Sequence, residues 1–167
     1  MTEDIKRYNG AWRQIRRTER AIGPEKAEAI LKEGKYGVLS TFGQDGFPYG
    51  VPVNYFYRDG HIYFHCAAEG HKMDNLASCP RVSFTVVKSD SVDGPHITTF
   101  YESAIAFGEA SVVRDQEEKR KLLVDLTVAL APGDQETRLA AEKCAAGPLD
   151  RVEVVDIAVE HISGKAH

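Results

Sequence analysis

Two Asp-Gly pairs constrain the fold more than any other feature of this chain. Asp45-Gly46 and Asp59-Gly60 each separate two runs of β-forming residues. Both residue types tolerate positive φ, so such a pair between apolar runs is the strongest local signal of a β-hairpin. The three runs, 36–42, 47–57 and 61–67, are therefore predicted to form an antiparallel meander.

Pro48 and Pro52 lie inside the second of these runs. Proline cannot donate a hydrogen bond to a neighbouring strand, which confines it to edge strands, strand starts and bulges. We therefore expect this strand to lie at an edge of the sheet or to contain a bulge.

The rest of the chain alternates between helical and strand-like patterns. Apolar spacing predicts helices over 24–33, 70–78 and 116–130, with a shorter one inside 132–148. Runs rich in β-branched and aromatic residues predict strands over 82–87, 97–113 and 152–162. Residues 88–96 are polar and turn-rich, and we expect a loop there. About six mostly antiparallel strands with inserted helices indicate a mainly β protein, a barrel or curled sheet.

Length and charge limit the classes of protein to consider. We expect 167 residues to form one domain, with a basic N-terminal arm over about residues 1–22. The net charge of −4 gives no electrostatic footprint for nucleic acid, and no apolar run approaches the roughly 20 residues that span a bilayer. The first residues are charged, unlike a secretory signal, and three cysteines are too few for a disulfide framework. A cytoplasmic location is therefore expected.

The segment from Phe64 to Leu76 carries the richest chemistry. It is predicted to run from strand through a tight turn into a helix, with His71 and Lys72 in the first helical turn. Free backbone N–H groups and the positive end of the helix dipole make such a turn an anion site. Asn75 lies four residues after His71, so both side chains can point the same way. The alternative is an ordinary solvated start of a helix.

Other kinds of site find less support in the sequence. His65, Cys66, His71 and Cys79 are close together, but neighbouring strand residues face opposite sides and no Cys-x-x-Cys motif is present, so no metal site is expected. No serine stands in a Gly-x-Ser-x-Gly elbow, and no Gly-x-Gly-x-x-Gly motif follows a strand.

Seven short motifs are spread over most of the chain from about residue 16. They are Arg16–Arg20, Gly46–Tyr55, His61–His65, Gly70–Leu76, Thr99–Ser103, Phe107-Gly108 and Ile162–Ala166. Together they resemble the pyridoxamine 5′-phosphate oxidase-like superfamily, and its nitroimidazole-resistance (NimA-like) branch in particular.

The resemblance implies an FMN-binding split β-barrel that forms a homodimer, with the flavin at the subunit interface. By position, the strand Val51, Pro52, Val53, Asn54 would run beside the isoalloxazine ring. His65, Cys66 and Ala67 would line the ribityl and phosphate end, and His71 and Lys72 would bind the phosphate, with Asn75 near them.

The chain also departs from the vitamin B6 oxidases. It has His71 where they have arginine, and Val51–Tyr55 replaces their Arg-x-x-Leu-Leu-Lys motif. Their substrate-binding arginine and histidine have no match in Val159–Ser163. We therefore expect not a pyridoxamine phosphate oxidase but an FMN-dependent reductase of small acceptors such as nitroaromatics, with a nicotinamide electron donor.

His71 is the candidate catalytic residue of such an enzyme, since one imidazole nitrogen can donate to a phosphate while the other accepts a proton. Two other functions stay open on the same barrel. One is haem binding through a histidine such as His65 or His71, and the other is non-catalytic flavin binding.

Overall fold

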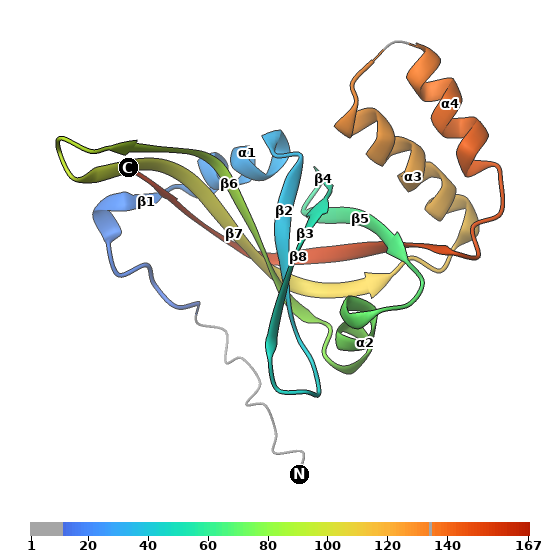
Figure 1. Cartoon of the computed structure of the whole chain (residues 1–167), viewed down its shortest axis with the longest axis horizontal. Coiled ribbons are helices and arrows are strands. Elements are labelled where there is room, and N and C mark those ends of the chain that lie inside the picture. Colours follow the sequence, from blue (N-terminus) through green and yellow to red (C-terminus); the bar gives the residue numbers. More distant parts are fainter. Residues whose placement is uncertain (1–11, 134) are drawn as a thin grey trace.

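The computed structural model describes residues 12–133 and 135–167, so residues 1–11 of the expected basic arm lie outside the description. The described residues form one antiparallel sheet of eight strands with inserted helices (Figure 1). The strands are β1 (Ala21–Ile22), β2 (Tyr36–Phe42), β3 (Pro48–Asn54), β4 (Phe56–Arg58), β5 (His61–Ala67), β6 (Arg81–Asp93), β7 (Thr98–Val112) and β8 (Val152–Ala166). The helices are the short 3-10 helix η1 (Thr18–Arg20), α1 (Pro24–Glu33), α2 (His71–Ser78), α3 (Gln116–Leu130) and α4 (Gln135–Ala145).

The strand order is β3-β2-β6-β7-β8-β5-β4, with β1 paired to β8. The mainly β, split-barrel fold class is thereby confirmed, with eight strands where about six were expected. The strand that carries Pro48 and Pro52 lies at one end of this order, as its prolines require.

Tyr55 divides the second run of the meander into β3 and β4. Its side chain is 1% exposed, its ring packs edge-on against Phe84, and its hydroxyl donates to the Leu31 carbonyl at 2.7 Å. Burial raises the pKa of this phenol. A buried tyrosine needs such a partner for its hydroxyl, and the hydrogen bond ties the strand to α1.

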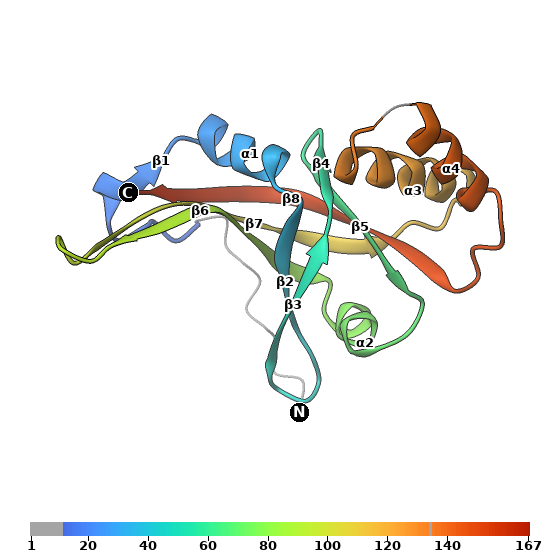
Figure 2. The ribbon, with the colours of Figure 1, turned by 45° about the horizontal axis from the view of Figure 1, so that its top comes forward.

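The main core lies between the inner face of the sheet and the helices that cover it. Alternate residues of each strand point inward, as Leu39 of β2, Ile62 and Phe64 of β5 and Phe84 of β6 do. Helix α1 adds Ile30 and packs against β7 and β8. Figure 2 shows α1 beside β8 and α2 beyond the end of β5, and both helices contribute to this one core.

A smaller layer forms where the hairpin of α3 and α4 covers the outer side of β5 and β8. Phe56 and Val154 of the sheet pack there against Leu122 and Leu126 of α3. The hairpin and the tip of the β6–β7 hairpin lie at opposite ends of the long axis of the molecule (Figure 1).

Residues 88–96, expected to be a loop, are mostly strand. β6 continues to Asp93 and pairs with β7 as far as Thr98, with a bulge between Val87 and Ser89. The polar composition indicated a loop, but pairing with a β-rich partner strand decides the structure.

None of the helices within the described residues is long and apolar enough to cross a membrane.

Candidate functional site

The candidate site begins where β5 turns into α2. Gly70 has a φ of 118°, a conformation that glycine adopts far more readily than any other residue. Its carbonyl accepts hydrogen bonds from Met73 and Asp74, and no side chain caps the helix. The first N–H groups of α2 are therefore free of a side-chain acceptor, which leaves them able to bind an anion.

His71 is the first residue of α2, and about half of its side chain is exposed. Its ring centroid lies 4.1 Å from that of Tyr49 on β3, and its Nε2 is 3.7 Å from a carboxylate oxygen of Asp45. Two carboxylates, Asp45 and Asp74, line a hollow of about 400 Å³ beside this histidine. Carboxylates repel an anion, so this hollow is an unfavourable place for one.

Asn75 connects α2 to the sheet. It is 4% exposed, and its side-chain amide donates to the hydroxyl of Thr41 at 2.9 Å. A Cβ on Gly43 would collide with the side-chain amide oxygen of Asn75, so any larger residue at this position would have to displace the Asn75 side chain. The geometry gives Asn75 a role in holding α2 against β2.

The four β3 residues of the expected flavin site alternate between the two faces of the strand. Val51 and Val53 pack against the main core, whereas Pro52 and Asn54 are exposed. The amide of Asn54 donates to the Lys35 carbonyl at 3.0 Å. Among the described strands, β3 pairs only with β2, so the backbone groups along its other side have no strand partner there and could bind a ligand.

The three β5 residues do not share one surface. Cys66 is buried, with its Sγ 3.5 Å from the sulfur of Met73 on α2, and burial raises the pKa of its thiol. His65 points to the other face of β5 and lines a hollow of about 300 Å³ with α3 and α4. Ala67 is exposed near the start of α2. Thus Cys66 and His71 belong to the α2 side, and the His65 side chain does not.

Sequence reasoning missed the neighbours of His71. Asp45 was recognised only as a turn residue, and Tyr49 only as part of a strand. Both reach His71 through the pairing of β2 with β3 and the packing of α2 on β2, which no local pattern reveals. Together, the open helix start and the edge strand β3 offer backbone groups that are able to meet a polar or anionic ligand.

The mainly β fold, with an open helix start beside an edge strand, places this chain in the class of split-barrel proteins. A family model described as pyridoxamine 5′-phosphate oxidase matches residues 24–166, and the chain belongs to that family. The resemblance predicted from the motifs is confirmed. No match was found among curated proteins.

Solved structures show the same fold. A candidate 5-nitroimidazole antibiotic resistance protein from Bacteroides thetaiotaomicron is 25% identical, with a TM-score of 0.69 over 87% of this chain and 85% of that one. A flavocytochrome from Azotobacter vinelandii is 17% identical, with a TM-score of 0.71 over 92% and 72%. An FAD-binding protein from Mesorhizobium loti is 22% identical, with a TM-score of 0.60 over 89% and 97%. The similarity to the nitroimidazole resistance protein supports the resemblance to the NimA-like branch that the motifs indicate.

Proposed function

We propose that this protein binds FMN, forms a homodimer around it, and reduces small oxidised acceptors of the nitroaromatic kind. The observation that carries the proposal is the uncapped start of α2, where Lys72 adds a positive charge next to the open N–H groups. Solved structures of the same fold include proteins described as FAD-binding and as a flavocytochrome, which supports a flavin as the ligand.

The residues present fit FMN at this place. The phosphate would be held by the first N–H groups of α2 and by Lys72, on the side away from Asp45 and Asp74. The free edge of β3, from Val51 to Asn54, would offer backbone donors and acceptors to the polar rim of the isoalloxazine ring. Cys66 and Ala67 would border the ribityl group that joins the ring to the phosphate. His65 could contribute only its backbone, because its side chain faces α3 and α4.

FMN, when bound, supplies the electron transfer from a nicotinamide donor to the acceptor. The protein's part is to fix the ring, to exclude water and to hold protons near it. His71 is the side chain placed for the last task, since its ring lies against Tyr49 on β3 and remains half exposed. Its Nε2 is 3.7 Å from the Asp45 carboxylate, beyond hydrogen-bond distance, and forms no hydrogen bond among the described residues.

A visible absorption spectrum of the purified protein tests the cofactor. We expect the two-band spectrum of an oxidised flavin, and release of FMN rather than FAD on denaturation. A sharp Soret band without flavin would instead establish the haem alternative. Bleaching of the flavin by NADPH or NADH, followed by recovery on adding a nitroimidazole, tests the reductase activity and separates it from simple flavin binding.

The variant His71→Arg separates a catalytic role of this residue from a binding role. Arginine can hold a phosphate but cannot act as a base at neutral pH. We expect unchanged FMN affinity with at least tenfold slower turnover, measured by flavin titration and by steady-state reduction of a nitroimidazole. Turnover equal to the wild type would exclude a catalytic role for His71.

A further inference from the structure

Six residues line the hollow beside α2, and all of them belong to α2 or to the turn between β2 and β3. They are Gln44, Asp45, His71, Asp74, Asn75 and Ala77. In the described ranges 12–133 and 135–167, no lysine or arginine forms an ion pair with Asp45 or Asp74. Two carboxylates without a lysine or arginine partner make this space, the α2 hollow, favourable for a positive charge.

The side-chain oxygen of Asn75 faces the α2 hollow. The hydroxyl of Thr41 donates to the Tyr49 carbonyl at 3.4 Å, so it can only accept the hydrogen bond that joins it to the Asn75 amide. The amide nitrogen therefore points to Thr41, and the Oδ1 points away. Asn75 is 4% exposed, and no described residue donates to its Oδ1. Since every fully buried side-chain polar atom of the described residues has a partner, this oxygen must reach the open space of the hollow.

Asp45 brings a carboxylate oxygen to the same space. A Cβ added to Gly43 would overlap the Asn75 Oδ1 and lie 3.2 Å from the Asp45 Oδ1, so both oxygens border the space that the glycine leaves open. The Asp45 Oδ1 accepts a hydrogen bond from the Phe47 N–H at 3.1 Å, which holds the carboxylate in the turn. An unpaired amide oxygen next to a carboxylate is satisfied by a hydrogen-bond donor that carries a positive charge.

The size and the chemistry of the α2 hollow favour an organic cation over a metal ion. Among the described residues, no three histidine, cysteine or acidic side chains are grouped closely enough to hold a metal ion. The volume of about 400 Å³ is within the range of small-molecule sites, roughly 300–1,000 Å³. A primary ammonium group carries three N–H donors, which matches one amide oxygen and two carboxylates.

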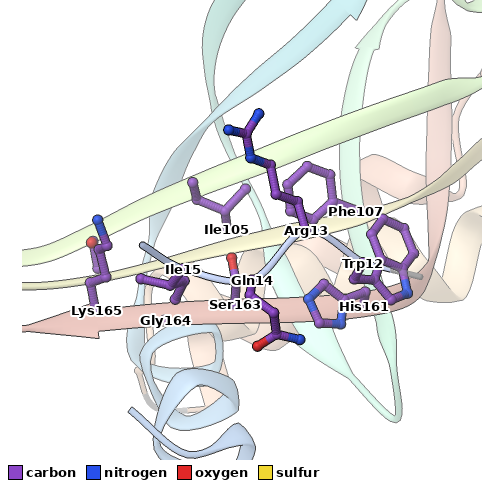
Figure 3. Close-up of a pocket in the computed structure, with 11 residues that line it drawn as sticks. Trp12, Arg13, Gln14, Ile15, Ile105, Phe107, His161, Ser163, Gly164 and Lys165 are labelled. Carbon is purple, nitrogen blue, oxygen red and sulfur yellow. The ribbon is translucent and has the colours of Figure 1, made fainter. Parts of the chain in front are cut away.

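A second cavity has the opposite charge. It lies between residues 12–15 and the outer face of β7 and β8, and its lining includes Arg13 and Lys165 but no carboxylate (Figure 3). These cations make that cavity unfavourable for an ammonium group. A cationic probe should therefore prefer the α2 hollow to this cavity.

We propose that the α2 hollow binds the protonated primary amine of a small organic molecule. The ammonium group donates to the Asn75 Oδ1 and to the carboxylates of Asp45 and Asp74. The inference goes beyond the proposed function, because the amine needs neither bound flavin nor electron transfer in order to bind.

Nuclear magnetic resonance of isotope-labelled protein tests the proposal, because the side-chain amides of Asn75 and Gln44 line the hollow and give signals of their own. The probe is benzylamine, which is an ammonium ion at neutral pH, and benzyl alcohol is its neutral analogue. We expect benzylamine to shift both amide signals in a saturable way and benzyl alcohol to leave them unmoved. The dispersion of each spectrum also shows whether the sample is folded.

Two variants test the carboxylates. Asp45→Asn and Asp74→Asn remove a charge and keep the side-chain shape, and asparagine suits the turn before Gly46 as aspartate does. Each should weaken benzylamine binding about threefold to fivefold, the change expected for one partly exposed ion pair. Asp59→Asn is the matched control, since it makes the same change in the other Asp-Gly turn, outside the hollow, and should leave the affinity unchanged.

Three results would overturn the proposal. One is the absence of a saturable shift with benzylamine, and another is an equal loss of affinity in Asp59→Asn. The third is tighter binding of Ca²⁺ or of inorganic phosphate, seen in the same two amide signals, which would make the hollow a metal or an anion site. The flavin content of each sample is read separately from its visible spectrum, so failure of the flavin proposal leaves this titration interpretable, and the reverse also holds.

Discussion

At the scale of single residues, Lys72 is the side chain that most directly tests the phosphate site. Replacing it with alanine removes a charged donor beside the open start of α2. We expect FMN binding to weaken by about 1.5–3 kcal/mol, the usual cost of losing a hydrogen bond to a charged group. Fluorescence titration of the apoprotein with FMN measures this, and Lys143→Ala on α4 is the control for net charge. An unchanged dissociation constant would remove Lys72 from the site.

Gly43 tests how α2 is held. An added Cβ would collide with the amide oxygen of Asn75, whereas a Cβ on Gly94 would meet nothing within 4 Å. We expect Gly43→Ala to destabilise the fold by about 1–3 kcal/mol in urea unfolding, the range for overpacking, and Gly94→Ala to change it by less than about 0.5 kcal/mol. Because Asn75 anchors α2, the first variant should also bind FMN more weakly. Equal stability of the two variants would contradict the role given to Asn75.

At the scale of elements, one buried ion pair fastens α3 to the sheet. The Lys119 residue is only 3% exposed, and its Nζ donates to Glu153 at 2.8 Å and to the Leu149 carbonyl at 3.2 Å. Breaking a fully buried pair costs about 3–5 kcal/mol of unfolding free energy, because it leaves an uncompensated buried charge. Since Glu153 is partly exposed, we expect Glu153→Gln to lower the unfolding free energy by an amount toward the lower end of this range. Denaturant unfolding measures it.

The matched control is the exposed pair of Arg58 and Asp125, which also joins the sheet to α3. An exposed ion pair contributes at most about 1 kcal/mol, so Asp125→Asn should have a small effect. If Glu153→Gln lowers the unfolding free energy by no more than Asp125→Asn does, the ion pair of Lys119 with Glu153 does not hold α3 to the sheet.

The elements show how far the sequence determines the fold. The Asp-Gly turns place β2 and β5 at the expected bounds, and helical spacing does the same for α3. The strand over residues 88–93 could not be predicted from its own polar side chains, because it forms by pairing with β7. In the candidate site, the strand–turn–helix of Gly70 and α2 was predictable locally. The contacts of His71 with Tyr49 and Asp45, and of Asn75 with Thr41, arise from tertiary packing.

At the scale of the whole molecule, the outer face of the sheet carries apolar side chains that a single subunit leaves uncovered. Tyr36 and Phe42 of β2 are 66% and 46% exposed, and Val38 lies between them on the same face. β6 adds the exposed Val87. Contiguous exposed apolar side chains mark interaction surfaces, and a twofold dimer would use the same patch on both subunits.

We therefore expect light scattering after size exclusion to report about twice the 18.5 kDa chain mass. Val38→Glu should give the monomer mass, because twofold symmetry buries the new charge twice and each unpaired buried charge costs several kcal/mol. Leu139→Glu, at an exposed leucine of α4, is the control and should remain dimeric. If the flavin is shared between subunits, the Val38→Glu monomer should also lose FMN while its far-UV spectrum stays native. A monomeric variant that keeps its flavin would show that one subunit binds FMN alone.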